Sequence, residues 1–266
     1  LCASRGLGDV YKRQQYIRAL GEKMLSNRVQ IYETSPVEEL IKAGSDWQAK
    51  TPKGLITAPK VILAVNGNIE NFGYFNNSLL HIYTYGSITQ KLTPNQIKIL
   101  GGKKEWGITP ADPLGTTVRR ISGSGGDRIV IRNRFTYNPN MRPNKSILDN
   151  VLRSHVKSFS DRFPMLKDIK LTQTWGGHLT LSRNNVAAFG ELKPGLFSAC
   201  CQNGLGTVKG TLHGLAAADL AMGKKTALVE QLLNNPMPKK LPFKPLTKIA
   251  VSSRIKLGEL LAGKEL

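Results

Sequence analysis

The chain has 266 residues, 40% of them apolar, which suffices for one large or two small domains, and no apolar run reaches the roughly 18 residues of a membrane span. Its formal net charge is +20, with basic residues spread along the whole chain rather than gathered beside aromatic residues. This pattern favours a basic solvated surface without a nucleic-acid partner, although charge alone leaves a nucleic-acid-binding domain open as an alternative.

The N-terminal segment and the cysteines bear on the origin and setting of the chain. Residues 1–14 have no period that continues into residue 15, and we expect them to be a non-native cloning or assembly scar. Cys2, Cys200 and Cys201 form no CxxC pair and show no Cys/His spacing typical of zinc. Together with the lack of a recognisable signal peptide, this predicts a reducing, cytoplasmic setting and no metal site.

Residues 15–68 change from a helical to an extended pattern. The expected elements are an amphipathic helix over 15–27, a strand over 29–34, a hairpin of 46–51 and 54–58, and a buried strand over 60–65. The last of these is almost continuously apolar, as a strand at the centre of a parallel sheet is. Asn66-Gly67 then ends it as a turn.

Residues 69–171 alternate between apolar and polar without intervening helices, which predicts an antiparallel sheet with one face free to line a ligand. The expected strands cover residues 79–85, 86–91, 117–122 and 128–132, and a helix over 146–163 ends at Pro164. Two large amphipathic side chains here, Trp106 and Tyr137, could wall an active site, although core packing is the simpler interpretation.

Residues 175–223 predict two buried strands, a glycine loop and a helix rich in small residues. The strands are 186–190 and 196–201, and the loop Asn203-Gly-Leu-Gly206 leads into a helix whose apolar face includes Leu212 and Leu215. Free N–H groups in the first turn of such a helix can face an anion or an electron-rich ring, and Thr207 can cap that turn. An ordinary tight strand–helix connection is the alternative interpretation.

These segments, taken in order, resemble FAD-dependent oxidoreductases of the D-amino-acid oxidase family, and within it the gamma-glutamylputrescine oxidoreductase-like amine oxidases. The likeness is carried by Ser35-Pro-Val37, Val65-Asn-Gly67, Trp175-Gly-Gly177, the strand that ends at Gly190, and Gly204-Leu-Gly206 with its helix. It implies an α/β (α+β) fold. The implied parts are an FAD/NAD(P)-binding Rossmann-like domain, present in part, at 15–68 and 172–235, an inserted antiparallel-sheet substrate domain at 69–171, and a C-terminal linker and helix at 236–266.

The resemblance implies FAD as the cofactor. It also implies oxidation of the C–N bond of a small-molecule amine or amino acid by hydride transfer, with O2 or another electron acceptor. The residues that it places against the cofactor are Val37, Asn66, Gly67, Gly190, Glu191, Asn203, Gly204, Leu205, Gly206 and Thr207. No side-chain nucleophile is needed for this chemistry. The side chains that could contact the substrate are Trp106, Tyr137, His178 and Arg183.

The sequence departs from the family in two places that bear on function. No strand–GxGxxG–helix motif occurs, so we expect an N-terminally truncated piece of a longer flavoprotein. His178 follows Gly177 where the amino-acid oxidases carry an arginine for the substrate carboxylate, which puts an alpha-amino-acid substrate in question. A flavoprotein-like pseudoenzyme is therefore the first alternative function.

Overall fold

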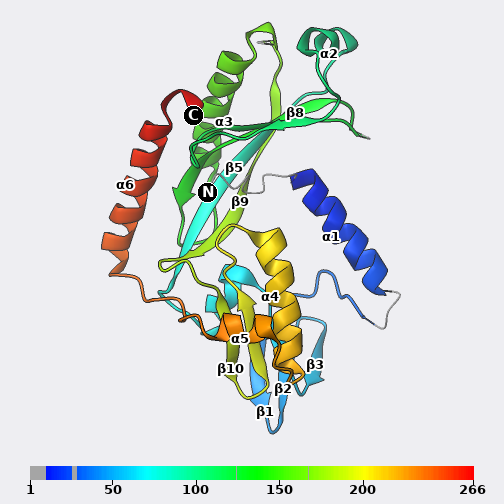
Figure 1. Cartoon of the computed structure of the whole chain (residues 1–266), viewed down its shortest axis with the longest axis vertical. Coiled ribbons are helices and arrows are strands. Elements are labelled where there is room, and N and C mark those ends of the chain that lie inside the picture. The colour runs from blue at the N-terminus through cyan, green and yellow to red at the C-terminus, as the bar shows by residue number, and fades with distance from the viewer. Residues whose placement is uncertain (1–9, 26–28, 124, 167) are drawn as a thin grey trace. The chain divides into compact units, whose positions relative to one another are not determined.

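The computed structural model describes residues 10–25, 29–123, 125–166 and 168–266, and these fall into two compact units (Figure 1). The loop unit comprises residues 10–80 and 180–241, and the sheet unit comprises 81–179 and 242–266. The boundaries after residues 80, 179 and 241 thus lie C-terminal to the expected ones, which follow residues 68, 171 and 235. The C-terminal helix, part of the expected linker-and-helix segment 236–266, belongs to the sheet unit.

The loop unit contains two small sheets and their helices. Its elements are α1 (Val10–Leu25), β1 (Glu39–Ala43), β2 (Asp46–Thr51), β3 (Gly54–Ala58), β4 (Val61–Leu63), the 3-10 helix η1 (Asn66–Phe72), β10 (Ala188–Lys193), β11 (Leu196–Cys200), α4 (Gly206–Ala221) and α5 (Ala227–Leu233). Strands β1, β2 and β3 form an antiparallel sheet. In the second sheet β11 is central, parallel to β4 and antiparallel to β10.

Three local expectations in this unit are wrong. The first helix begins at Val10, so helical structure runs through residue 14, where we expected a discontinuity. Residues 29–34 form no strand, and the exposed side chains of Ile31 and Tyr32 pack on no neighbouring strand. Alternation alone does not make a strand, because the ladder of hydrogen bonds needs a partner. Strand β4, which we expected at the centre of its sheet, is an edge strand, because among the described strands it pairs only with β11.

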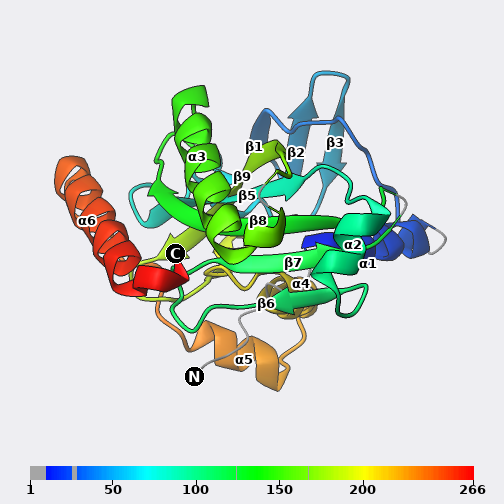
Figure 2. The same ribbon diagram turned by 90° about the horizontal axis from the view of Figure 1, so that it is seen from above.

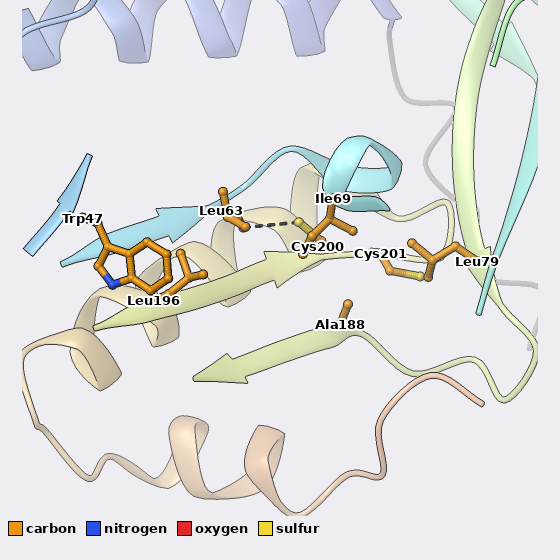
Figure 3. Close-up of a cluster of buried hydrophobic side chains, with 8 residues drawn as sticks. All are labelled: Trp47, Leu63, Ile69, Leu79, Ala188, Leu196, Cys200 and Cys201. Atoms are coloured by element: carbon orange, nitrogen blue, oxygen red, sulfur yellow. Dashed lines mark hydrogen bonds between the residues drawn. The ribbon is translucent and has the colours of Figure 1, made fainter. Parts of the chain in front are cut away.

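Apolar side chains from the two sheets and η1 form the core of the loop unit (Figure 3). The cluster consists of Trp47, Leu63, Ile69, Leu79, Ala188, Leu196, Cys200 and Cys201. Helix α4 packs on β10 and β11 through Ala216 and Ala217, which are fully buried. The expected apolar face of this helix, which also included Ala216 and Leu220, is right only in part: those two residues pack against the sheet, whereas Leu212 and Leu215 are exposed. The small alanines allow the close approach to the sheet.

The sheet unit is built on one five-stranded sheet in the order β6-β7-β8-β5-β9. Its elements are β5 (Leu79–Thr89), α2 (Pro94–Leu100), β6 (Trp106–Ile108), β7 (Thr117–Ile121), β8 (Arg128–Tyr137), α3 (Lys145–Arg162), η2 (Pro164–Leu166), β9 (Leu171–Ser182), α6 (Lys244–Ala262) and η3 (Gly263–Glu265). The expected strands 79–85 and 86–91 are one continuous strand. The pairs β6–β7, β7–β8 and β5–β8 are antiparallel, as expected.

Helix α3 covers one face of this sheet (Figure 2). Its residue Val151 packs with Tyr83 and Tyr85 of β5, and Phe159 joins a larger cluster with Ile129 and Ile131 of β8. Asn144 caps the helix by accepting the N–H of Ile147 at 2.9 Å. Within the described residues, no helix combines the length and the apolar character that crossing a bilayer requires.

Candidate functional site

Two of the predicted cofactor segments meet at one edge of the loop unit. Asn66-Gly67 follows β4, and the loop 202–205 follows β11. Because β4 and β11 are parallel neighbours, their carboxyl ends lie at the same edge, which is where ligands bind in α/β sheets. The Sγ of Cys200 lies 3.2 Å from the carbonyl oxygen of Leu63, which ties the two strand ends together (Figure 3).

The loop after β11 has an unusual backbone held by one side chain. Cys201, Asn203 and Gly204 have φ values of 58°, 51° and 81°, in the left-handed region. The Oδ1 of Asn203 accepts the N–H of Ser182 at 2.8 Å, and its Nδ2 donates to the carbonyl of Val186 at 2.9 Å. The Asn203 side chain is therefore occupied within the protein, and contacts with a ligand fall to the backbone of this loop.

Helix α4 begins at Gly206 without a side-chain cap. Its N-cap residue is Leu205, which has no acceptor to offer, so the expected capping role of Thr207 is wrong. The carbonyl of Thr207 instead accepts the hydroxyl of Thr211 at 2.7 Å. The first-turn N–H groups, with the positive end of the helix dipole behind them, stay available for an electronegative partner.

Two observations at this edge fit a polar ring such as that of a flavin. Asn66 has φ of 50°, and its Oδ1 is buried without a hydrogen-bond partner among the described residues. A buried oxygen in that state costs about 1–3 kcal/mol, which a donor on a ligand would offset. A Cβ built at Gly206 would meet no atom within 4 Å, so the backbone there is open to close approach.

Other predicted cofactor residues do not lie at this edge. Gly190 is buried against Leu233 and Met237, each 3.5 Å from a Cβ built there. Glu191 pairs with Phe197, toward the far end of β10, and its Oε1 accepts the N–H of the hairpin residue Gly195 at 2.9 Å. Because β10 runs antiparallel to β11, it carries both residues away from this edge, and their closeness to the flavin ring stays a prediction. Val37 is exposed in an irregular segment before β1.

The face of the five-stranded sheet opposite α3 is a second candidate surface. Alternate residues of β5 point to opposite faces. Ser87 lies on the α3 face, where its Oγ is 2.7 Å from His155 Nδ1. Its neighbour Gly86 lies on the other face, where the ring of Trp175 is so close that an added Cβ would come within 2.9 Å of it. Gly86 thus makes room for a large, 36% exposed aromatic ring on the sheet.

Beside Trp175, the same face carries a guanidinium held in place by hydroxyl groups. Arg132 pairs with Gly86 in the β5–β8 ladder and is half-buried. Its Nη1 donates to Thr84 Oγ1 at 3.1 Å, and its Nη2 lies 3.5 Å from Thr117 Oγ1. The guanidinium also stacks on Phe135, 5.2 Å from the ring centroid. A positioned guanidinium of this kind binds carboxylates, and the sequence analysis missed it.

The four predicted substrate residues are dispersed. Trp106 pairs with Arg120 and packs against Phe163 beside the core cluster beneath α3, which agrees with core packing, the simpler interpretation of this side chain. Tyr137 pairs with Ile82 in the β5–β8 ladder, which puts it on the same face as Arg132. Two residues lie elsewhere: His178 on the α3 face and Arg183 in an exposed turn after β9.

His178 belongs to an aromatic cluster at one end of β5 and β9. Its ring stacks on His81 with centroids 5.2 Å apart, and His178 Nε2 lies 3.0 Å from His81 Nδ1. Burial, with the neighbouring His81 as a smaller cause, lowers the pKa of His178. A neutral ring stacked in this way is a packing group rather than a carboxylate ligand.

Ser87 and His155 are the one Ser–His pair in hydrogen-bond contact among the described residues, and both are fully buried. Burial lowers the pKa of His155 to about 4, and no carboxylate is hydrogen-bonded to its ring in this part of the chain. The ring of His155 projects from α3 onto the sheet, where a substrate cannot reach it. The pair therefore stabilises the sheet–helix interface and does not form a catalytic nucleophile.

The parallel-strand edge with its backbone loop, joined in sequence to a five-stranded sheet, makes an α/β (α+β) protein whose edge suits a cofactor. The model of the family described as FAD-dependent oxidoreductase (DAO) matches residues 5–220, and the chain belongs to this family, whose cofactor is FAD. The match begins at residue 5, inside the segment 1–14 that we expected to be foreign. Residues 1–9 of that segment lie outside the described part of the chain.

Two curated relatives match most of this chain. It is 23% identical to the probable oxidoreductase OrdL of Haemophilus influenzae over 220 residues, 78% of this chain and 46% of that protein. It is also 23% identical to OrdL of Rhizobium meliloti over 225 residues, 84% of this chain and 49% of that protein. The chain thus spans about half the length of the curated relatives it matches.

Solved structures with the same fold include amino-acid oxidases. Glycine oxidase from Geobacillus kaustophilus superimposes with a TM-score of 0.61 at 18% identity, over 85% of this chain and 57% of that one. L-proline dehydrogenase from P. horikoshii gives a TM-score of 0.57 at 18% identity, over 82% of this chain and 57% of that one. At these identities the likeness establishes the fold alone.

Proposed function

We propose that the complete protein is an FAD-dependent enzyme that oxidises the C–N bond of a small-molecule amine or amino acid. The observation that carries the proposal is the edge where Asn66-Gly67 and the loop 203–207 come together, in a chain of a flavin-dependent family. FAD, when bound, supplies the redox chemistry by accepting a hydride from the substrate carbon and passing the electrons to O2 or another acceptor.

In this proposal the chain holds the cofactor ring mainly through its backbone. The amides at the start of α4 would hold the electron-rich edge of the ring, and the helix dipole would favour negative charge there. Asn66 contributes its buried Oδ1 as an acceptor. Asn203 acts through the loop, because its side-chain groups are bonded to Ser182 and Val186.

We assign substrate recognition to the face of the sheet unit that carries Trp175 and Arg132. Thr84 and Thr117 orient the guanidinium of Arg132, which binds a carboxylate of the substrate. The ring of Trp175 offers an apolar surface to the rest of the molecule. This arrangement favours substrates with a carboxylate, in contrast to the expectation drawn from His178.

Flavin retention tests the cofactor half of the proposal. The protein is expressed from its natural coding sequence, purified, and its flavin content measured for wild type and for Gly206→Val. Gly206 is exposed and an added Cβ meets nothing, so the variant should fold normally yet lose its flavin. Gly214→Val is the matched control, because Gly214 lies in the same helix and is equally open. A Gly206→Val protein that stays fully loaded contradicts the loop assignment.

Reduction of the bound flavin tests the catalytic half. Amines, alpha-amino acids and N-alkylated amino acids are added without oxygen, and bleaching of the flavin absorbance is followed. Bleaching by a member of this panel, with formation of the corresponding carbonyl compound and release of the amine, supports the proposed activity. A flavin-loaded protein that no member reduces, but that dithionite does reduce, contradicts it and favours the pseudoenzyme.

A further inference from the structure

A pocket in the loop unit, apart from the edge described above, has a volume of about 260 Å³ and lies between α4, α5 and β10. It is lined by Asn185, Val186, Ala187, Phe189, Lys209, His213, Leu232 and Asn235. Its volume far exceeds the roughly 30 Å³ share of one water, but is smaller than the about 300–1,000 Å³ typical of sites for drug-sized ligands. The pocket therefore suits a small molecule.

A buried imidazole in the wall of this pocket lacks a partner. His213 is 6% exposed, and its Nδ1 is buried without a hydrogen bond to any described residue. Burial, with the ammonium group of Lys209 as a smaller cause, lowers the pKa of His213, so its ring is neutral near pH 7. Leaving such a nitrogen unpaired is costly, and a polar group in the pocket would satisfy it.

The charges and apolar surfaces around His213 indicate what that molecule is. Lys209 lies one turn earlier on α4 and is half-buried, and no Asp or Glu is among the residues that line the pocket. The rings of Phe189 and His213 are 6.1 Å apart, and Leu232 completes an apolar wall. This combination of a positive charge and an apolar wall favours an organic anion.

We propose that this pocket binds a small carboxylate with an apolar body, with the carboxylate at Lys209 and the body against Phe189 and Leu232. The exposed side of α4 at Val208 and Leu212 takes no part in this site. The site does not depend on the flavin chemistry proposed above, because its residues are distinct from those of the loop 203–207.

Phenylacetate is a suitable probe, with neutral phenylacetamide as its matched control. Each is titrated into the 266-residue chain while the ring signals of its four histidines are followed by NMR. We expect saturable one-to-one binding of phenylacetate that shifts the His213 ring, and binding of phenylacetamide at least about tenfold weaker, because a charged hydrogen bond is lost. Equal affinity for the two compounds, or no saturable binding, overturns the proposal.

Variants then locate the binding site. Lys209→Gln should weaken phenylacetate binding about tenfold or more, whereas Lys225→Gln, an exposed lysine of the same unit with the same loss of charge, should leave it unchanged. His213→Asn, which keeps a polar group in the wall, provides a second test inside the pocket. If Arg132→Met abolishes binding while Lys209→Gln does not, the carboxylate binds at the sheet face and the pocket assignment is wrong.

Discussion

Asn203 Oδ1 accepts the backbone N–H of Ser182 at 2.8 Å, so a residue in the loop before α4 fixes the segment that ends β9. The same side chain donates from Nδ2 to the carbonyls of Val186 and Cys201, at 2.9 and 3.2 Å. One amide thereby ties three backbone positions together, and the loop backbone keeps its left-handed conformation at Asn203 without help from a ligand.

Asn203→Asp tests this bracing role. The carboxylate retains the acceptor for Ser182 but replaces the donor with an oxygen that faces the carbonyl of Val186. We expect the free energy of unfolding to fall by about 1–3 kcal/mol, measured by urea denaturation. Asn234→Asp, at the end of α5, is a control that should change stability by less than about 0.5 kcal/mol. Equal stability of the Asn203→Asp variant and wild type contradicts the bracing role.

Gly86→Ala tests the contact between Trp175 and the sheet. The added methyl group would lie 2.9 Å from the indole ring, so either the ring or the strand must move. Overpacking of this kind costs about 1–3 kcal/mol, which thermal or urea unfolding can measure. Gly177→Ala is the matched control in the neighbouring strand, where the nearest atoms are at 3.8 Å and the change should be small. If the two variants unfold alike, Trp175 does not rest on Gly86.

His155 predicts a pH dependence of stability. Burial holds its pKa at about 4 in the folded protein, against 6.5 in the unfolded chain, and the nearby charges of Arg134 and Arg132 add to the lowering. The unfolded state therefore binds more protons between pH 6.5 and 4, so stability falls as the pH drops through this window. The total loss is up to roughly 3 kcal/mol.

The measurement is urea denaturation of wild type and His155→Gln at several pH values. The variant should be less stable at pH 7, since Ser87 loses its contact with His155 and keeps only Thr174 as a partner, but its stability should depend less on pH between 6.5 and 4. Because burial also lowers the pKa of His178 and His213, only the difference between the two proteins reports on His155. Parallel pH profiles would show that His155 is not held neutral.

Most elements with a strong local pattern could be predicted from the sequence. The hairpin of β2 and β3, the helix α3 that Pro164 follows, and the succession β10, β11, α4 are set by periodicity, turn residues and proline. The failures are elements whose strand partner the local pattern does not show. Residues 29–34 alternate but find no neighbouring strand, and residues 39–43, for which no strand was predicted, form β1 by pairing with the adjacent β2.

In the candidate site, too, residues marked by a local sequence signal were predictable and the others were not. Asn66 and the loop before α4 were predictable, because a strand that ends in Asn-Gly and a glycine turn that opens a helix are local signals. The role of Arg132 was not predictable, because the alternation of apolar and polar residues separates the two faces of β8 but does not say which face α3 covers. Trp106 shows the same ambiguity: the alternating pattern of its strand does not tell that its side chain lies on the face that α3 covers.

Arg132→Lys tests the proposed carboxylate site in the natural full-length protein. Lysine keeps the charge but cannot form the two-pronged contact that Thr84 and Thr117 orient. KM for a carboxylate-bearing substrate should rise about 10- to 100-fold, whereas that for the matching amine without a carboxylate should change little. Arg153→Lys, on the exposed side of α3, keeps both values near wild type. Equal increases for both substrates would indicate a general disturbance of the sheet and would contradict carboxylate recognition by Arg132.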